Sequence, residues 1–178
     1  MNEWLDFGVQ LVLAVRLLGP LLIFRWPLVG AILSEFVFDA SDVIIWDAFG
    51  SLSHINYTVW DKSLDMYQLT IQAVVVWRWT QQKPRRVALW LYGVRTAGFL
   101  FYELTHIRVV FLVCANVFVL FFITYLIFAK FGKAQWFDQG RFLARVVMLL
   151  WLVKLPQEYV LHYMEVPMWN VIKKIFGI

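Results

Sequence analysis

Two pairs of aspartates interrupt long apolar stretches of this chain and constrain its fold more than any other feature. Asp39 and Asp42 lie in FVFDASDVIIW, and Asp61 and Asp65 lie in WDKSLDMYQL. A carboxylate at the centre of a membrane-spanning helix costs about 2.5 kcal/mol or more. Such a residue is retained where the protein interior, another side chain or an ion offsets that cost. We therefore expect both pairs to face the inside of a helical bundle and to mark its functional site.

The composition places this bundle in a membrane. Of the 178 residues, 62% are hydrophobic and 16% are charged, whereas average soluble domains have about 45–50% and about 25%. A soluble domain of this size would have too little polar surface to cover so many apolar residues. The net charge of +4 is spread over short loops, which favours contact with a membrane surface over nucleic acid. The sequence predicts one integral membrane domain, 1–178, with membrane lipids as partners.

The apolar stretches predict an all-α fold, a polytopic transmembrane bundle of about six spanning helices, since about 20 apolar residues cross a bilayer. The expected spans are 5–24, 27–47, 58–79, 87–104, 107–129 and 143–163. The very short link 25–27 makes the first two helices antiparallel neighbours. In the tail, a short amphipathic pattern around Lys173 and Lys174 predicts an interfacial C-terminal helix, and the alternative is a frayed end with two solvated lysines.

Lysine and arginine counts in the short connections predict the orientation of the chain. One basic group follows the third predicted span and another follows the fifth, whereas the opposite side has Lys62, Arg108 and the tail lysines. The two groups are Arg78, Lys83, Arg85 and Arg86, and Lys130, Lys133, Arg141 and Arg145. This bias places both groups in the cytoplasm, and it places both chain termini and the four aspartates toward the outer face of the cell membrane.

Helical spacing brings further polar side chains to the aspartates. Glu35, Asp39 and Asp42 follow an i, i+4, i+7 pattern, which predicts one common face. Asp61 and Asp65 continue through Gln68 and Gln72 as a second polar stripe. Carboxylates that meet in a low dielectric require a cation, a basic partner or protonation. Hard cations such as Mg²⁺, Mn²⁺ or Ca²⁺ prefer such oxygen ligands, and Mg²⁺ or Mn²⁺ is the cofactor we expect.

Basic side chains on other segments are candidate partners for these acids. Arg95 lies in the fourth predicted span, and Lys154, Glu158 and His162 share one face of the sixth. Arg16 can enter from the first span. We expect Arg95 and Lys154 to point into the same cavity as the aspartates, as ion-pair partners or as phosphate contacts. The alternative is an internal ion-pair network that only orders the bundle.

The spacing of the four aspartates resembles the CDP-alcohol phosphatidyltransferase family, whose signature pairs D-x-x-D with a later D-x-x-x-D. The resemblance implies that Asp39, Asp42 and Asp61 hold the metal and that Asp65 acts as the catalytic base. Val43, the pair Trp46–Asp47 and Tyr57 stand where the family has Gly, Ala-Arg and Gly. In the family those positions serve the cytidine diphosphate, and an outward-facing site here fits a polyprenyl-phosphate type of donor better.

These observations favour a divalent-metal-dependent enzyme that transfers a phosphate-linked group to or from a lipid. Its substrate-binding residues would be Arg95, Lys154, Glu158, His162 and Gln68. One alternative is a non-catalytic, lipid-binding or structural subunit, associated with a membrane-protein partner or with further copies of this chain. The other alternative is a proton- or ion-coupled transporter, against which the sequence shows no half-helix break or inverted repeat.

Overall fold

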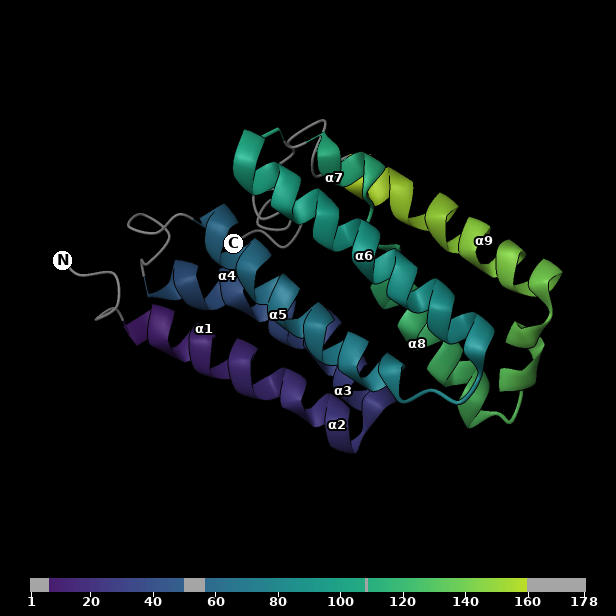
Figure 1. The fold of residues 1–178 in the computed structure, drawn as a ribbon. Coiled ribbons are helices and arrows are strands. Elements are labelled where there is room, and N and C mark those ends of the chain that lie inside the picture. Colours follow the sequence, from purple (N-terminus) through teal and green to yellow (C-terminus); the bar gives the residue numbers. More distant parts are fainter. Residues whose placement is uncertain (1–6, 50–56, 108, 160–178) are drawn as a thin grey trace.

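The structure is a computed structural model that describes residues 7–49, 57–107 and 109–159. Every regular element in these ranges is a helix, so the all-α prediction is confirmed for this part of the chain. The helices run alongside one another as an elongated bundle (Figure 1). The tail that contains Lys173 and Lys174, together with His162, lies outside the described residues.

Short irregular turns link several helices into longer rods. In chain order the elements are α1 Phe7–Leu18, η2 Gly19–Leu21, α2 Leu22–Arg25, α3 Pro27–Leu33, η3 Ser34–Phe38, α4 Asp39–Ala48, α5 Tyr57–Trp77, α6 Gln82–Thr105, α7 Val110–Val113, α8 Val117–Lys130, η5 Ala134–Asp138 and α9 Gly140–Glu158. The segments η2 and η5 are 3₁₀ turns, and η3 is a π-helical turn. These rods coincide with the segments that the sequence predicted to be helical.

Fewer helices than predicted are long and apolar enough to cross a membrane. Among the described residues, two stretches are long and apolar enough to cross a membrane, Phe7–Arg25 and Val110–Lys130, whereas about six were expected. The other rods carry charges inside their apolar windows, for example Asp61, Lys62 and Asp65 in α5. These polar residues lower the mean hydropathy of the helices that carry them.

The link at Trp26 folds the chain back, so that α2 and α3 pack as the neighbours that the short link predicted. Pro27 begins α3, where the missing N–H of proline costs no hydrogen bond. Gly30 lies at the contact, since a Cβ added there would be 2.6 Å from the backbone nitrogen of Ile23. Any side chain at position 30 would therefore push the two backbones apart.

We expect Gly30→Ala to lower the free energy of unfolding by about 1–3 kcal/mol, the usual cost of overpacking a tight contact. Thermal unfolding in detergent, followed by circular dichroism, measures this loss. Gly93→Ala is the matched control, because a Cβ at Gly93 meets nothing within 4 Å. There the better helix propensity of alanine should leave stability unchanged or raise it by up to about 1 kcal/mol. Equal effects at both positions would contradict the close approach of α2 and α3.

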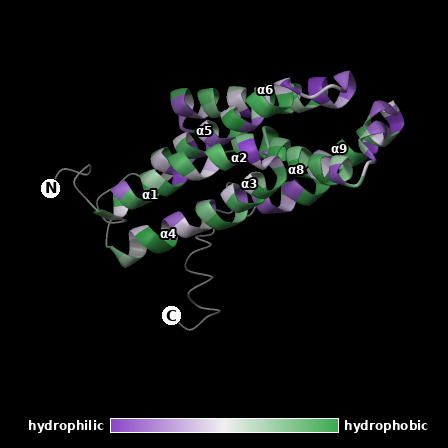
Figure 2. Ribbon diagram, turned by 90° about the horizontal axis from the view of Figure 1, so that it is seen from below, coloured by the Kyte–Doolittle hydropathy of each residue, from purple (hydrophilic) through white to green (hydrophobic). Residues whose placement is uncertain are grey.

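Aromatic packing joins the connection between α5 and α6 to α8 and to the turn before α9. Trp79 stacks on Tyr125 with ring centroids 3.7 Å apart, and Phe137 meets Tyr125 edge-on at 5.3 Å. Lys83 Nζ donates a hydrogen bond to the carbonyl oxygen of Asp138 at 2.6 Å. The two basic connections therefore meet at one end of the bundle, which we call the basic end. Figure 2 shows hydrophilic residues gathered at this end and hydrophobic ones along the rods.

Candidate functional site

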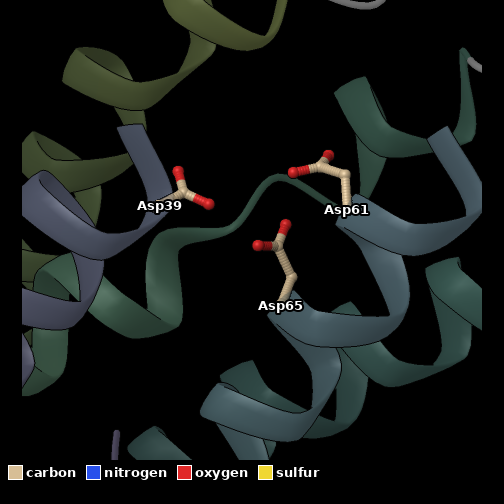
Figure 3. Close-up of side chains that lie close together, drawn as sticks. All are labelled: Asp39, Asp61 and Asp65. Atoms are coloured by element: carbon tan, nitrogen blue, oxygen red, sulfur yellow. The ribbon is translucent and has the colours of Figure 1, made fainter. Parts of the chain in front are cut away.

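Three carboxylates converge inside the opposite end of the bundle. Asp39 begins α4, and Asp61 and Asp65 lie one turn apart on α5. One oxygen from each lies within 4.8 Å of the other two. Figure 3 shows the three side chains directed at one another. We call Asp39, Asp61 and Asp65 the acidic cluster.

Two basic side chains contact the acidic cluster. Arg16, on α1 and only 2% exposed, donates hydrogen bonds to Asp39 and, at 2.8 Å, to Asp65 Oδ1. Lys62 Nζ lies 2.7 Å from Asp61 Oδ2 and 3.5 Å from Asp65 Oδ2. Asp65 is therefore shared by both cations. The sequence anticipated Arg16 as a partner from the first helix but counted Lys62 as a loop charge.

Lys62 could have been found from its position in the chain. It follows Asp61 directly and precedes Asp65 by three residues, a separation at which side chains meet on a helix. Lys62 was counted only as a charge on the outer side, although the predicted span 58–79 already contained it, as α5 Tyr57–Trp77 does.

The predicted metal-ligand set differs from the carboxylates that converge. It contained Asp39, Asp42 and Asp61, but Asp65 takes the place of Asp42 in the acidic cluster. Asp42 is buried, with 1% of its surface exposed, and the charge of Arg16 acts on it. The expected common face of Glu35, Asp39 and Asp42 assumed regular α-helix. The π-helical turn Ser34–Phe38 contains Glu35 and changes its register relative to Asp39 and Asp42, which both lie in the regular helix α4.

A second polar layer lies below the acidic cluster on α5. Gln68 donates a hydrogen bond through Nε2 to Glu35 Oε2 at 3.1 Å. Gln72 is fully buried, with 0% of its surface exposed, and neither of its amide atoms has a hydrogen-bond partner among the described residues. The polar stripe predicted on this helix therefore faces the protein interior, as the high cost of amides in lipid requires.

The third polar group surrounds a break between α7 and α8. Arg95 donates a hydrogen bond to the carbonyl oxygen of Cys114 at 3.2 Å, and its guanidinium lies 4.6 Å from the centre of the Phe111 ring. The backbone N–H of Asn116 donates to Glu158 Oε1 at 3.2 Å. The sequence argument that this chain has no half-helix break is therefore wrong at residues 114–116, where the helix is interrupted.

Electrostatic interactions connect these layers. Lys154 Nζ lies 4.0 Å from Glu158 Oε1, and its charge also acts on Glu35. The charge of Arg95 acts on Asp65 and on Lys62. Arg95 and Lys154 are both buried, so they face the polar interior together with the acids. The structure thus brings together the described site residues from α4, α5, α6 and α9, although it assigns no chemistry to them.

The chain matches no protein-family model, and comparison with curated proteins and with solved structures finds no similar chain. The resemblance to the CDP-alcohol phosphatidyltransferases therefore rests on the aspartate spacing alone and supports no family assignment.

Proposed function

We propose that this chain is an integral membrane protein whose acidic cluster binds a divalent cation and acts on a phosphate-linked group of a lipid. The observation that carries the proposal is the convergence of three carboxylates, from α4 and α5, within 4.8 Å of one another. Hard cations bind oxygen ligands at about 2.0–2.6 Å, so two ligands of one ion lie at most about 5 Å apart. The spacing of the acidic cluster fits that limit.

The surface of the bundle supports a membrane environment. Large apolar side chains are exposed along several helices, including Trp77 at 70%, Trp90 at 66% and Leu104 at 84%. The charged residues within the rods, by contrast, include Arg16, Arg95, Lys154 and Glu158, each buried. This apolar exterior and polar interior is the arrangement that lipid favours. Under the proposal, α6 and α9 also span the membrane, with Arg95, Lys154 and Glu158 buried inside the bundle.

The charge balance of the interior leaves room for a cation. In and around the acidic cluster, the described residues include the buried or partly buried acids Glu35, Asp39, Asp42, Asp61, Asp65 and Glu158, and the bases Arg16, Lys62, Arg95 and Lys154. Carboxylates therefore outnumber basic groups, and a divalent cation would compensate the excess. Oxygen-only donors favour Mg²⁺ or Mn²⁺ over softer metals.

Arg16 and Lys62 would orient the substrate. Their positive groups already lie beside the acidic cluster, within reach of a phosphate that approaches it. Guanidinium and ammonium groups are the usual hydrogen-bond donors to phosphate oxygens in proteins. A bound divalent cation supplies neutralisation of phosphate charge. Asp65, which lies between Arg16 and Lys62, would accept the proton of the attacking lipid hydroxyl.

Manganese binding tests the proposal. Purified protein in detergent should bind Mn²⁺ in electron paramagnetic resonance titrations, and Asp65→Asn should weaken this binding by at least about 100-fold, because even residues that only support metal ligands contribute about 10–100-fold. Asp138→Asn is the matched control, since Asp138 is exposed at the basic end. A wild-type protein that binds no Mn²⁺ at millimolar concentration would sink the proposal.

A purely structural role is the second candidate, and the ion pairs favour it. Arg16 and Lys62 already satisfy parts of all three carboxylates, and such a network can fix how helices pack without binding a ligand. A non-catalytic subunit of a membrane complex would need no more than this. Under this alternative, Mn²⁺ binding should be absent, whereas removal of Arg16 should still destabilise the protein.

A further inference from the structure

An apolar groove runs between α6 and α9, away from the acidic cluster. It encloses about 680 Å³, within the usual range of ligand pockets. Its walls include Trp90, Leu91 and Val94 on α6 and Leu143, Ala144 and Met148 on α9. The side chains of Trp90 and Met148 are largely exposed at its edges. The groove therefore opens onto the outer surface of the bundle and offers almost no polar partner to an occupant.

One end of the groove carries positive charge. Gly140 and Val87 line this end, and Arg141 and Arg86 are their direct neighbours in sequence. Arg86 precedes Trp90 by four residues and Arg141 precedes Met148 by seven. Each arginine therefore shares a helix face with a residue at the edge of the groove. Both arginines are exposed. Among the described residues, no carboxylate lies within ion-pair distance of either one.

We propose that the α6–α9 groove binds an anionic phospholipid, with its acyl chains between the helices and its phosphate between Arg86 and Arg141. The charge complementarity selects this occupant, because an apolar slot with unpaired arginines at one end matches an apolar tail with a negative head group. Lys83 is held by the carbonyl of Asp138 at this same end and keeps α6 and the turn before α9 together. The inference rests on the proposed membrane location and not on the cation site.

A second copy of this chain is a less suitable occupant. A helix from another copy would bring its apolar face to the groove but would leave Arg86 and Arg141 without an opposite charge. The exposed acids of the described residues include Asp138, which lies on η5 and not on an apolar helix face. A phospholipid supplies both the apolar tail and the negative charge in one molecule.

Native mass spectrometry of the protein in detergent, titrated with phosphatidylglycerol or phosphatidylcholine of equal chain length, tests the proposal. We expect tighter binding of phosphatidylglycerol, and a loss of this preference by about fivefold in Arg141→Gln and about 25-fold in Arg86→Gln with Arg141→Gln, since each basic residue near a head group contributes about fivefold. Arg25→Gln is the matched control, because Arg25 is exposed at the end of α2, outside the groove. Its preference should equal that of the wild type.

Filling the groove separates tail binding from head-group binding. Ala144→Trp places a large ring between the walls and should weaken both lipids, whereas Gly93→Trp, on α6 with nothing within 4 Å of its added Cβ, should weaken neither. Equal binding of the two lipids by the wild type would overturn the proposal. A protein dimer that Ala144→Trp converts to monomer would also overturn it and assign the groove to a second copy. Manganese binding should be the same in all these variants, so a failure here is distinguishable from a failure of the cation site.

Discussion

Arg16→Met should lower the free energy of unfolding by roughly 3–5 kcal/mol, the usual cost of breaking a buried ion pair by removing one partner. Arg16 is almost fully buried and bonds to both Asp39 and Asp65. Methionine fills a similar volume but leaves two carboxylates of the acidic cluster without their guanidinium. Chemical denaturation in detergent, followed by tryptophan fluorescence, measures the loss.

Two further variants sharpen this test. Arg25→Met removes an exposed arginine whose guanidinium lies 5.8 Å from the centre of the Trp26 ring, and it should change stability by no more than about 0.5 kcal/mol. Adding Asp39→Asn to Arg16→Met removes one of the uncompensated charges and should recover part of the loss. If Arg16→Met unfolds at the same denaturant concentration as the wild type, the ion pairs do not hold α1 to α4 and α5.

Lys154→Met is the second substitution with a large expected effect, a loss of about 3 kcal/mol or more. Lys154 is buried on α9, lies 4.0 Å from Glu158 and acts on Glu35 as well. Its removal takes a buried positive charge away from both carboxylates. The same denaturation experiment measures the effect, and Lys130→Met, at an exposed lysine near the end of α8, is the control.

The outcome also decides what Lys154 does. A structural pair predicts lower stability with unchanged lipid and phosphate binding. A ligand contact predicts the opposite, a stable protein that no longer binds phosphate. A variant that keeps both properties would show that the ammonium group only reaches toward the membrane interface. In that case α9 would contribute nothing to the polar interior through this residue.

Much of the fold follows from local patterns in the sequence. Apolar stretches of helical length predicted the rods, and the short link at Trp26 predicted the packing of α2 on α3. The spacing of Asp61, Asp65, Gln68 and Gln72 predicted an inward polar stripe on α5, and those side chains are buried or half-buried. Each of these features depends on the regular period of an α-helix, which residue spacing reports directly.

The acidic cluster was predicted less well because its membership depends on how helices pack. Asp39 and Asp42 both lie in the regular helix α4, but only Asp39 converges with Asp61 and Asp65 of α5. Residue spacing within one helix does not report which of its carboxylates a second helix meets. The number of spans was predicted less well too, because apolar stretches interrupted by charged residues were counted as spans, and two described stretches are long and apolar enough to cross a membrane.

The break between α7 and α8 has a consequence for how the bundle can move. A helix end in an apolar environment needs partners for its exposed backbone groups, and residues close in sequence usually supply them. Here the partners come from other helices. The guanidinium of Arg95 on α6 donates to the carbonyl oxygen of Cys114, and the carboxylate of Glu158 on α9 accepts from the backbone N–H of Asn116. The end of α7 and the start of α8 are thus capped by side chains of other helices of the same chain. Sliding α6 past α7, or α9 past α8, would uncap a helix end inside the protein, so these two contacts oppose axial sliding of the helices.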